Sequence, residues 1–382
     1  MPYAASMRLA DLETPALILD AAKMRANIAR MNATARRHGV VLRPHLKTGK
    51  SVEVAKAMTA GWPGAVTVST LKEADRFFAA GFRDILYAVG IAPNKLAHAA
   101  RLTREGCVLT LILDSLEAAE MVAAFGRENG VTLPALIEID SDDHRAGVGP
   151  DDAATLAAIA TALTDGAELR GVMTHGGGSY NSTTEEGLAA HAELERSGAV
   201  RAAENLRAAG FACPVVSVGS TPTALFARNL DGVTELRVGV YVFHDLVMAG
   251  LGVCAVEDVA VGVLASVIGH QAARGQLIID AGWMAMSRDR GTQGQQVDQG
   301  YGLVCDAGGR ALGDLIVASA NQEHGIVARR DGGPLDVARF PVGTLLRVLP
   351  NHSCATAAQH GEYQVVDGGD AIVGTWQRFG GW

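Results

Sequence analysis

The feature that most constrains the fold is an alternation of short β-branched runs with longer amphipathic segments over the first 240 residues. Eight runs are expected as strands: 40–42, 65–69, 84–88, 108–113, 135–140, 169–175, 215–218 and 234–237. Helical patterns separate them, at about 50–60, 71–80, 93–104, 116–129, 151–164, 184–209 and 222–229. Such alternation is typical of parallel strands, and eight units predict an α/β fold, a (β/α)8 TIM barrel. An open doubly wound sheet is the alternative, and the count of eight favours the barrel.

The character of the sequence changes after about residue 250. Segments 259–268, 277–280, 314–318 and 344–348 are strand-like, with glycine-rich turns and little helical pattern between them. We therefore expect two domains in the 382 residues: a barrel over 15–250 and a C-terminal antiparallel β domain over 251–382, together with residues 1–14.

Composition argues against several classes of function. The net charge of -8 disfavours nonspecific nucleic-acid binding, because contacts to phosphates require a positive surface. No run of about 18 apolar residues occurs, so we expect no membrane span. The five cysteines form no C-x-x-C pair and the N-terminus lacks a signal-peptide pattern, which favours a cytoplasmic location.

Polar side chains follow the predicted strands at the point where each strand ends, and active sites of barrels are built at that face. Lys47 comes after the first strand, in the stretch R-P-H-L-K-T-G-K, and Arg145 comes after the fifth. His175 ends the sixth strand, and Tyr180 lies in the loop that follows it. These residues are the first candidates for a site.

The loops after the seventh and eighth strands suit a phosphate group. Glycine lets the backbone approach a ligand, Ser220 and Thr221 offer hydroxyl groups, and these two loops are the usual phosphate site of a barrel. A phosphate site on the same rim as a lysine predicts pyridoxal 5'-phosphate, whose aldehyde the lysine would bind covalently. Lys47 is the candidate lysine by its place at a strand end, and composition alone leaves Lys50 and Lys72 as alternatives.

These motifs resemble those of the fold-type III pyridoxal-phosphate enzymes, whose N-terminal domain is like that of alanine racemase, and within them the D-serine dehydratase and D-threonine aldolase group. R-P-H-L-K-T at 43–48 resembles the motif of the cofactor lysine, which makes Lys47 the catalytic residue. R-V-G-V at 237–240 is similar to the racemase signature, which implies that Arg237 faces the pyridine nitrogen and that Gly239 and Val240 bind the phosphate.

The same resemblance, which spans nearly the whole chain, gives roles to the remaining rim residues. Arg145 would lie near the phenolic oxygen of the cofactor, and His175 would stack on its ring. Tyr180, Ser220 and Thr221 complete the expected cofactor site.

The motif P-N-H-S-C-A-T at 350–356 places His352 and Cys354 two residues apart. On a strand, residues i and i+2 point to the same face, so both side chains could bind one ion. Imidazole and thiolate favour zinc, although an open site with two protein ligands could also take Mg2+, Mn2+ or Co2+. D-threonine aldolases of the group carry aspartate where this chain has cysteine, so the motif resembles that of the dehydratases.

The resemblance implies a dehydratase, an ammonia-lyase that removes water from D-threo-3-hydroxyaspartate or D-serine and gives a 2-oxo acid (oxaloacetate or pyruvate) and ammonia. The metal ion would act on the leaving hydroxyl group as a Lewis acid. An aldolase that forms glycine and an aldehyde from D-threonine or 3-hydroxy-D-aspartate is the alternative. A racemase would give the metal pair no role, and the second domain argues against a non-catalytic pyridoxal-phosphate carrier. The group also implies a homodimer.

Overall fold

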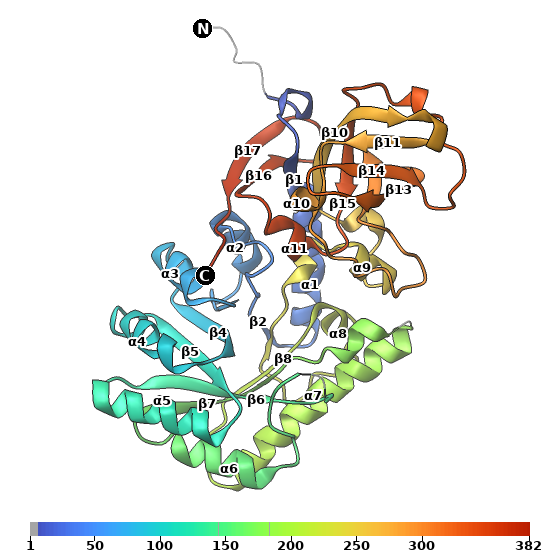
Figure 1. Cartoon of the computed structure of the whole chain (residues 1–382). Coiled ribbons are helices and arrows are strands. Elements are labelled where there is room, and N and C mark those ends of the chain that lie inside the picture. Colours follow the sequence, from blue (N-terminus) through green and yellow to red (C-terminus); the bar gives the residue numbers. More distant parts are fainter. Residues whose placement is uncertain (1–6, 144, 183) are drawn as a thin grey trace. The chain divides into compact units, whose positions relative to one another are not determined.

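The computed structural model describes residues 7–143, 145–182 and 184–382, and the chain divides into two compact units (Figure 1). The first unit contains the residues up to Ala29 and Val240–Gly380, and the second contains Arg30–Gly239 and the last two residues. These boundaries differ from those expected at residues 15 and 250. The N-terminal difference arises because β1 (Ala16–Asp20) pairs with β10 and β16 of the first unit, so the chain enters the barrel only along α1 (Ala21–Arg37).

Eight strands form the sheet of the second unit, and every pair of neighbours is parallel. Their order is β2 (Val41–Leu42), β9 (Glu235–Leu236), β8 (Val215–Val218), β7 (Ala167–Thr174), β6 (Leu133–Ile139), β5 (Val108–Leu113), β4 (Asp84–Gly90) and β3 (Val66–Val68). A parallel bridge between His45 and Thr67 joins the chain just after β2 to β3. The two ends of the order thus meet, and the predicted barrel is confirmed.

Helices follow the strands in turn and lie outside them (Figure 1). They are α2 (Val52–Thr59), α3 (Leu71–Ala79), α4 (Leu96–Arg104), α5 (Leu116–Asn129), α6 (Ala153–Ala162), α7 (Glu185–Ala208) and α8 (Thr221–Phe226). Thr70, Ser115 and Thr184 each precede a helix and accept a hydrogen bond from the backbone N–H three residues on. At these three positions a polar residue between the strand and the helix starts the helix.

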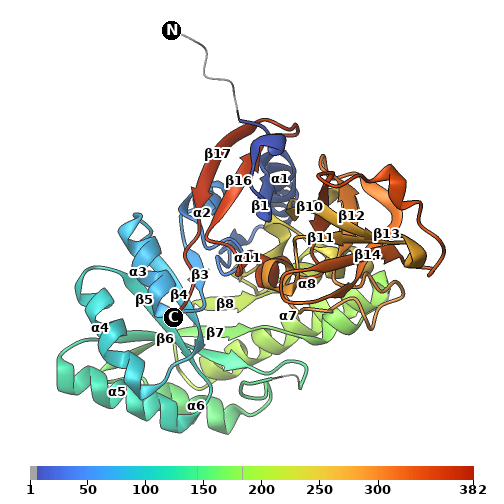
Figure 2. The same ribbon diagram turned by 45° about the horizontal axis from the view of Figure 1, so that its top comes forward.

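The first unit is built on a nine-stranded sheet. Its order is β11 (Gln276–Ile279), β14 (Gly325–Arg329), β13 (Ala311–Ala320), β12 (Leu303–Asp306), β15 (Leu345–Leu349), β10 (Val261–Gln271), β1, β16 (Glu362–Val366) and β17 (Ile372–Gln377). An additional antiparallel pairing of β10 with β11 closes the first six strands into a small barrel. Figure 2 shows β16 and β17 beside β1. The antiparallel β domain expected from the sequence is confirmed.

Short helices complete the described structure. Besides the first part of α1, the first unit contains α9 (Leu246–Gly250), α10 (Trp283–Met286) and α11 (Ser353–Ala357). The 3-10 turns are η1 (Leu9–Asp11), η2 (Pro93–Lys95), η3 (Gly178–Asn181), η4 (Val240–Val242), η5 (Val256–Asp258), η6 (Ala272–Arg274) and η7 (Val337–Arg339). None of the helices in the described part of the chain combines the length and the apolar character needed to cross a bilayer.

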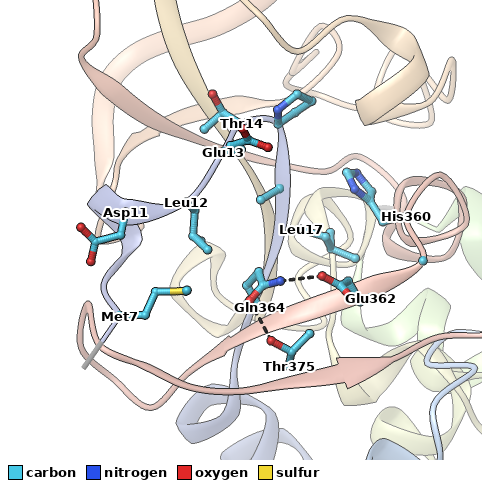
Figure 3. A pocket seen from close by; sticks show the side chains of 13 residues that line it. Met7, Asp11, Leu12, Glu13, Thr14, Leu17, His360, Glu362, Gln364 and Thr375 are labelled. Carbon is cyan, nitrogen blue, oxygen red and sulfur yellow. Dashed lines mark hydrogen bonds between the residues drawn. The ribbon is translucent and has the colours of Figure 1, made fainter. Parts of the chain in front are cut away.

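A pocket of about 550 Å³ lies in the first unit, between the N-terminal segment and β16 (Figure 3). Carboxylates of Asp11, Glu13 and Glu362 are among the groups that line it. None of the residues that the sequence analysis selected lines this pocket.

Candidate active site

Lys47 lies in the turn that follows β2, and its side chain is exposed. The turn continues to Lys50, whose φ of 44° is in the left-handed region that a lysine rarely adopts. The Lys50 ammonium is 3.0 Å from Oε1 of the buried Glu73, and Oε2 of Glu73 accepts a hydrogen bond of 3.0 Å from the N–H of Ser69. This ion pair ties the turn that carries Lys47 to the loop after β3.

Two histidines lie on the same rim as Lys47. Nδ1 of His175 is 3.1 Å from the carbonyl oxygen of Gly219, so Nδ1 must carry the proton that forms this hydrogen bond. Burial, followed by the charges of Arg237, Lys47 and Arg145, outweighs this bond and lowers the pKa of His175 to about 3. The ring is therefore neutral at pH 7, with Nε2 unprotonated.

The pKa of His45 is also held well below its usual value, first by burial and then by Lys47, Arg237 and His175. The same two cations, Lys47 and Arg237, act on both histidines. His45 was not among the predicted site residues. Its Nδ1 lies 3.4 Å from the backbone N–H of Lys47, which places it at the base of the lysine turn.

Ser220 and Thr221 are buried at the start of α8. The Ser220 side chain caps this helix by accepting a hydrogen bond from the Thr223 N–H. In the loop that follows β9, a Cβ added at Gly239 would lie 3.0 Å from the carbonyl oxygen of His45. The R-V-G-V segment therefore packs directly against the residues that precede Lys47, and Val240, the next residue, begins η4.

The remaining two rim candidates are exposed. Nη2 of Arg145 lies 3.2 Å from Oε1 of the buried Glu138, whose pKa is raised because burial outweighs the charge of Arg145. Tyr180 is on η3, with 37% of its surface exposed.

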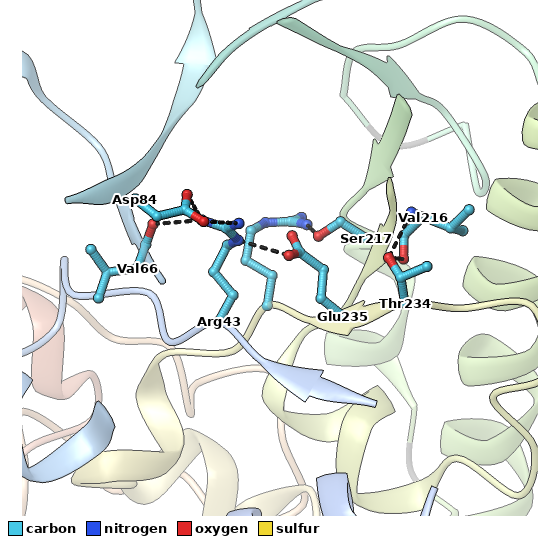
Figure 4. A network of polar contacts seen from close by, with 8 residues as sticks. Arg43, Val66, Asp84, Val216, Ser217, Thr234 and Glu235 are labelled. Carbon is cyan, nitrogen blue, oxygen red and sulfur yellow. Dashed lines mark hydrogen bonds and ion pairs between the residues drawn. The ribbon is translucent and has the colours of Figure 1, made fainter. Parts of the chain in front are cut away.

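The barrel interior contains a buried ionic network below this rim. Nε of Arg43 donates to Oε2 of Glu235 at 2.8 Å, and its two Nη atoms donate to Asp84 at 2.8 and 3.2 Å (Figure 4). Arg237 is also buried and donates to Ser217 Oγ at 2.9 Å and to the Thr174 carbonyl at 2.6 Å. The predicted Arg237 thus lies inside the barrel, fixed by neutral acceptors.

Sequence reasoning missed Glu195, which is 2% exposed on α7. Its carboxylate accepts hydrogen bonds from the Gly176 N–H and the Thr223 hydroxyl. Burial raises the pKa of Glu195 to about 7, against the effect of these bonds. The signal was present in the sequence: Glu195 follows the buried Ala192 by three residues and precedes the buried Ala199 by four, so it lies on the apolar stripe of the helix.

In the first unit, the expectation that His352 and Cys354 lie on a strand is wrong. Strand β15 ends at Leu349, and the pair lies at the start of α11, with His352 as the residue that precedes the helix and Cys354 in its first turn. The two side chains are nevertheless hydrogen-bonded to each other. Close approach of imidazole and sulfur therefore comes from a helix start, not from alternation along a strand.

Asp289, which sequence reasoning also missed, is hydrogen-bonded to the His352 ring through Nδ1. Nδ1 of His352 lies 2.8 Å from Oδ2 of Asp289. Burial lowers the pKa of His352, but the hydrogen bonds to Asp289 and Cys354 and the charge of Asp245 outweigh it and raise the pKa to about 11. Asp245 is buried and accepts a hydrogen bond of 3.1 Å from the Ser353 N–H, which anchors the segment between the two candidate ligands.

Over the residues that the structure describes, no cluster of three or more histidine, cysteine, aspartate or glutamate side chains has the arrangement of a metal site. A metal ion held by His352 and Cys354 would thus have two protein ligands, and its other positions would be filled by water or substrate.

Two family models match the chain: the alanine racemase N-terminal domain over residues 19–246 and the serine dehydratase domain over residues 260–366. The chain belongs to the alanine racemase-like family that carries a serine dehydratase domain. The predicted family is therefore confirmed, and the second match covers the segment with His352 and Cys354.

The D-threo-3-hydroxyaspartate dehydratase of Delftia sp. is 59% identical to this chain over 98% of it and 99% of the relative. Its solved structure matches with a TM-score of 0.96 at 58% identity, over 98% of this chain and 100% of that one. A solved cysteine-to-alanine variant of such a dehydratase, with the same TM-score, is described as being in the metal-free form.

Two more distant relatives represent the two branches of the group. A D-serine dehydratase of Dictyostelium discoideum is 30% identical over 96% of this chain and 96% of the relative. A D-threonine aldolase of Arthrobacter sp is 30% identical over 94% of this chain and 91% of the relative.

Proposed function

We propose that this protein is a pyridoxal 5'-phosphate- and metal-dependent dehydratase that converts D-threo-3-hydroxyaspartate to oxaloacetate and ammonia, with D-serine as a second substrate that gives pyruvate. The observation that carries this proposal is the 59% identity to a D-threo-3-hydroxyaspartate dehydratase along nearly the full length of both chains. The aldolases of the group are more distant, at 30% identity or less.

The residues at the barrel rim fit pyridoxal phosphate. Lys47 is exposed and able to reach an aldehyde, and the cations that lower the pKa of His175 make the site electropositive, as a phosphate requires. Lys47 would hold the cofactor covalently, with Ser220, Thr221, Gly239 and Val240 at its phosphate. Arg145, His175, Tyr180 and Arg237 would surround its ring.

The pair in the first unit fits a divalent metal ion. Nδ1–H of His352 donates a hydrogen bond to Asp289, so an ion that displaces the second ring proton would bind Nε2, and the sulfur of Cys354 lies beside the same ring. The nitrogen and sulfur donors favour zinc, with Mg2+, Mn2+ and Co2+ as alternatives. The existence of a metal-free form of the related cysteine-to-alanine variant supports a metal role for Cys354.

In the proposed reaction the chain's own residues hold and move protons. After the substrate amine has replaced Lys47 on the cofactor, the freed Lys47 amine, which is exposed on the rim, would take the proton from Cα of the substrate. Bound pyridoxal phosphate supplies an electron sink for the Cα electrons. His352 and Cys354 would hold the ion, which would supply Lewis acidity for loss of the β-hydroxyl group. The neutral His175 ring cannot donate a second proton at Nε2, so it acts by contact and not as an acid.

The proposal includes a homodimer in the cytoplasm that acts on small molecules and binds neither nucleic acid nor membranes. The family resemblance supports the dimer. The net charge of -8 argues against nucleic acid, and the five cysteines without a C-x-x-C pair favour a reducing compartment.

Product analysis tests the function. The purified protein is incubated with D-threo-3-hydroxyaspartate, D-serine and D-threonine, with and without EDTA. Oxaloacetate or pyruvate with ammonia, lost on EDTA treatment, supports the dehydratase, whereas glycine with an aldehyde would show an aldolase. Cys354→Ala should abolish the product, and Cys254→Ala, at another partly exposed cysteine, is the matched control that should leave it unchanged.

A further inference from the structure

The loops after β7 and β8 are joined through one buried carboxylate. Oε1 of Glu195 accepts a hydrogen bond of 2.7 Å from the Gly176 N–H, in the loop after β7. Oε2 accepts one of 2.6 Å from the Thr223 hydroxyl, in the first turn of α8. A single side chain of α7 therefore reaches the two segments that carry His175 and Ser220.

The first of these bonds fixes the backbone next to His175. Gly176 is the residue after His175, and a Cβ added there would meet Cγ and Oε1 of Glu195 at 3.0 Å. Glycine leaves room for this close approach, because any Cβ at this position would force the Glu195 side chain to shift by a few tenths of an ångström. The same loop is held a second time two residues on, where the Gly178 N–H donates to Asp142 at 2.8 Å.

The second bond fixes the backbone at Ser220. Thr223 Oγ1 accepts the Ser220 N–H at 3.0 Å while its own proton goes to Glu195. The carbonyl of Gly219, one residue earlier, accepts the hydrogen bond from His175 Nδ1 at 3.1 Å. The contacts thus close a ring from Glu195 through Gly176 and His175, across to Gly219 and Ser220, and back through Thr223.

The helix itself gives no reason for a carboxylate at this position. Ala192 and Ala199, one turn before and after Glu195, are buried alanines, as is usual where a helix packs on a barrel. Burying a carboxylate is unfavourable unless it is hydrogen-bonded, and both oxygens of Glu195 are used by the two loops. The unfavourable burial of the Glu195 carboxylate is therefore offset by the same two hydrogen bonds that hold the loops of the rim.

We propose that Glu195 is a positioning residue of the cofactor site: it locks the loops after β7 and β8 to each other and so sets the places of His175 and Ser220. This inference rests on the proposed function, because those two residues matter for the cofactor only if pyridoxal phosphate binds at the rim. Glu195 itself touches neither cofactor nor substrate in this scheme.

The test measures the dissociation constant of pyridoxal phosphate, by titration of the apoprotein, and the visible absorption maximum of the loaded protein. The variants are Glu195→Gln, Glu195→Ala and Thr223→Val, with Thr223→Ser as the conservative variant that retains the hydroxyl. Glu193→Gln is the matched control, since Glu193 is on the same helix, is half exposed and, among the described residues, forms an ion pair with Arg196 alone. Leu206→Ala, a buried site on α7 outside the ring, controls for loss of stability alone.

We expect Glu195→Ala and Thr223→Val each to weaken cofactor binding by about 10-fold or more and to shift the absorption maximum, because each removes a hydrogen bond to a charged group. Glu195→Gln, which keeps an acceptor for Gly176, should have a smaller effect, and Thr223→Ser should restore binding. Leu206→Ala should lower the melting temperature and leave the affinity unchanged.

Wild-type affinity and absorption in folded Glu195→Ala would overturn the inference. If that variant does not fold, wild-type affinity in Thr223→Val would overturn it. A wild-type protein that binds no pyridoxal phosphate would instead refute the proposed function, so the two failures are distinguishable.

Discussion

Replacing Arg43 by leucine tests whether the charged network inside the barrel stabilises the fold. The Arg43 side chain is 11% exposed and bonds Glu235 and Asp84, and the Glu235 side chain is 8% exposed. Removing one partner of a buried ion pair leaves the other charge without compensation, which typically costs about 3–5 kcal/mol. Oε1 of Glu235 has no hydrogen-bond partner among the described residues, so Glu235 has no second cation bonded to it that could take over.

The expected result is a loss of about 3–5 kcal/mol in the free energy of unfolding, measured by urea titration of the purified protein. For a domain of this size, about 1 kcal/mol lowers the melting temperature by roughly 2–4 °C, so the expected decrease is about 6–20 °C. Arg101→Leu is the matched control, because the Arg101 side chain is 47% exposed and also pairs with two carboxylates, Asp75 and Glu105. Exposed pairs contribute at most about 1 kcal/mol, so this variant should remain close to wild type.

A second variant separates the charge from the shape of the side chain. Arg43→Leu combined with Glu235→Gln removes both charges of the buried pair, and this should recover part of the lost stability. Equal effects of Arg43→Leu and Arg101→Leu would refute the reasoning, because the buried and exposed arginines would then contribute alike. No recovery in the double variant would show that packing, and not the uncompensated carboxylate, causes the loss.

Three further predictions concern the two candidate sites. Lys47→Ala should abolish covalent labelling by pyridoxal phosphate and borohydride in mass spectrometry, yet change the melting temperature little, because the Lys47 side chain is exposed. Asp289→Asn should weaken divalent metal binding by about 10- to 100-fold in a chelator competition, since the carboxylate orients His352; an unchanged affinity would contradict this. The pKa of Glu195 is raised to about 7, above about 4.3 for an unfolded glutamate, so its stabilisation is complete below that lower value and is lost as pH rises through 7. The melting temperature of wild type relative to Glu195→Gln should thus fall between pH 5 and 8, and a constant difference would contradict the assignment.

The barrel could be predicted because each of its strands has a signal in its own short stretch of sequence. The run 215–218 coincides with β8, and β-branched runs followed by polar residues mark the other strand ends to within a few residues. The place of β1 was not predictable in the same way. The sequence of β1 and α1, a strand followed by a helix, has the pattern of a barrel unit. Which sheet β1 joins depends on the strands with which it pairs. Those partners, such as Val263 opposite Leu17, lie some 246 residues away in the chain.

The candidate ligands were recognisable from motifs, whereas the side chains that orient them were not. Asp289 and His352 are 63 residues apart, and nothing in the segment S-R-D-R-G indicates which residue its aspartate contacts. The strand geometry expected for His352 and Cys354 failed because spacing by two residues does not distinguish a strand from the first turn of a helix. Glu195 was the exception, since its place on an apolar helical stripe was visible in the sequence.

The buried Arg237 links the ionic network of the barrel to the rim. Burial lowers the pKa of its guanidinium, and the charges of Glu235, Glu195 and Glu138 act in the opposite direction. Among the described residues no carboxylate lies within ion-pair distance of Arg237, and the hydrogen bonds it donates go to a hydroxyl and a carbonyl oxygen. Its charge is thus compensated from a distance by three carboxylates and is not neutralised by one. A cation held in this way keeps its charge, and that charge helps to lower the pKa of both rim histidines, His45 and His175.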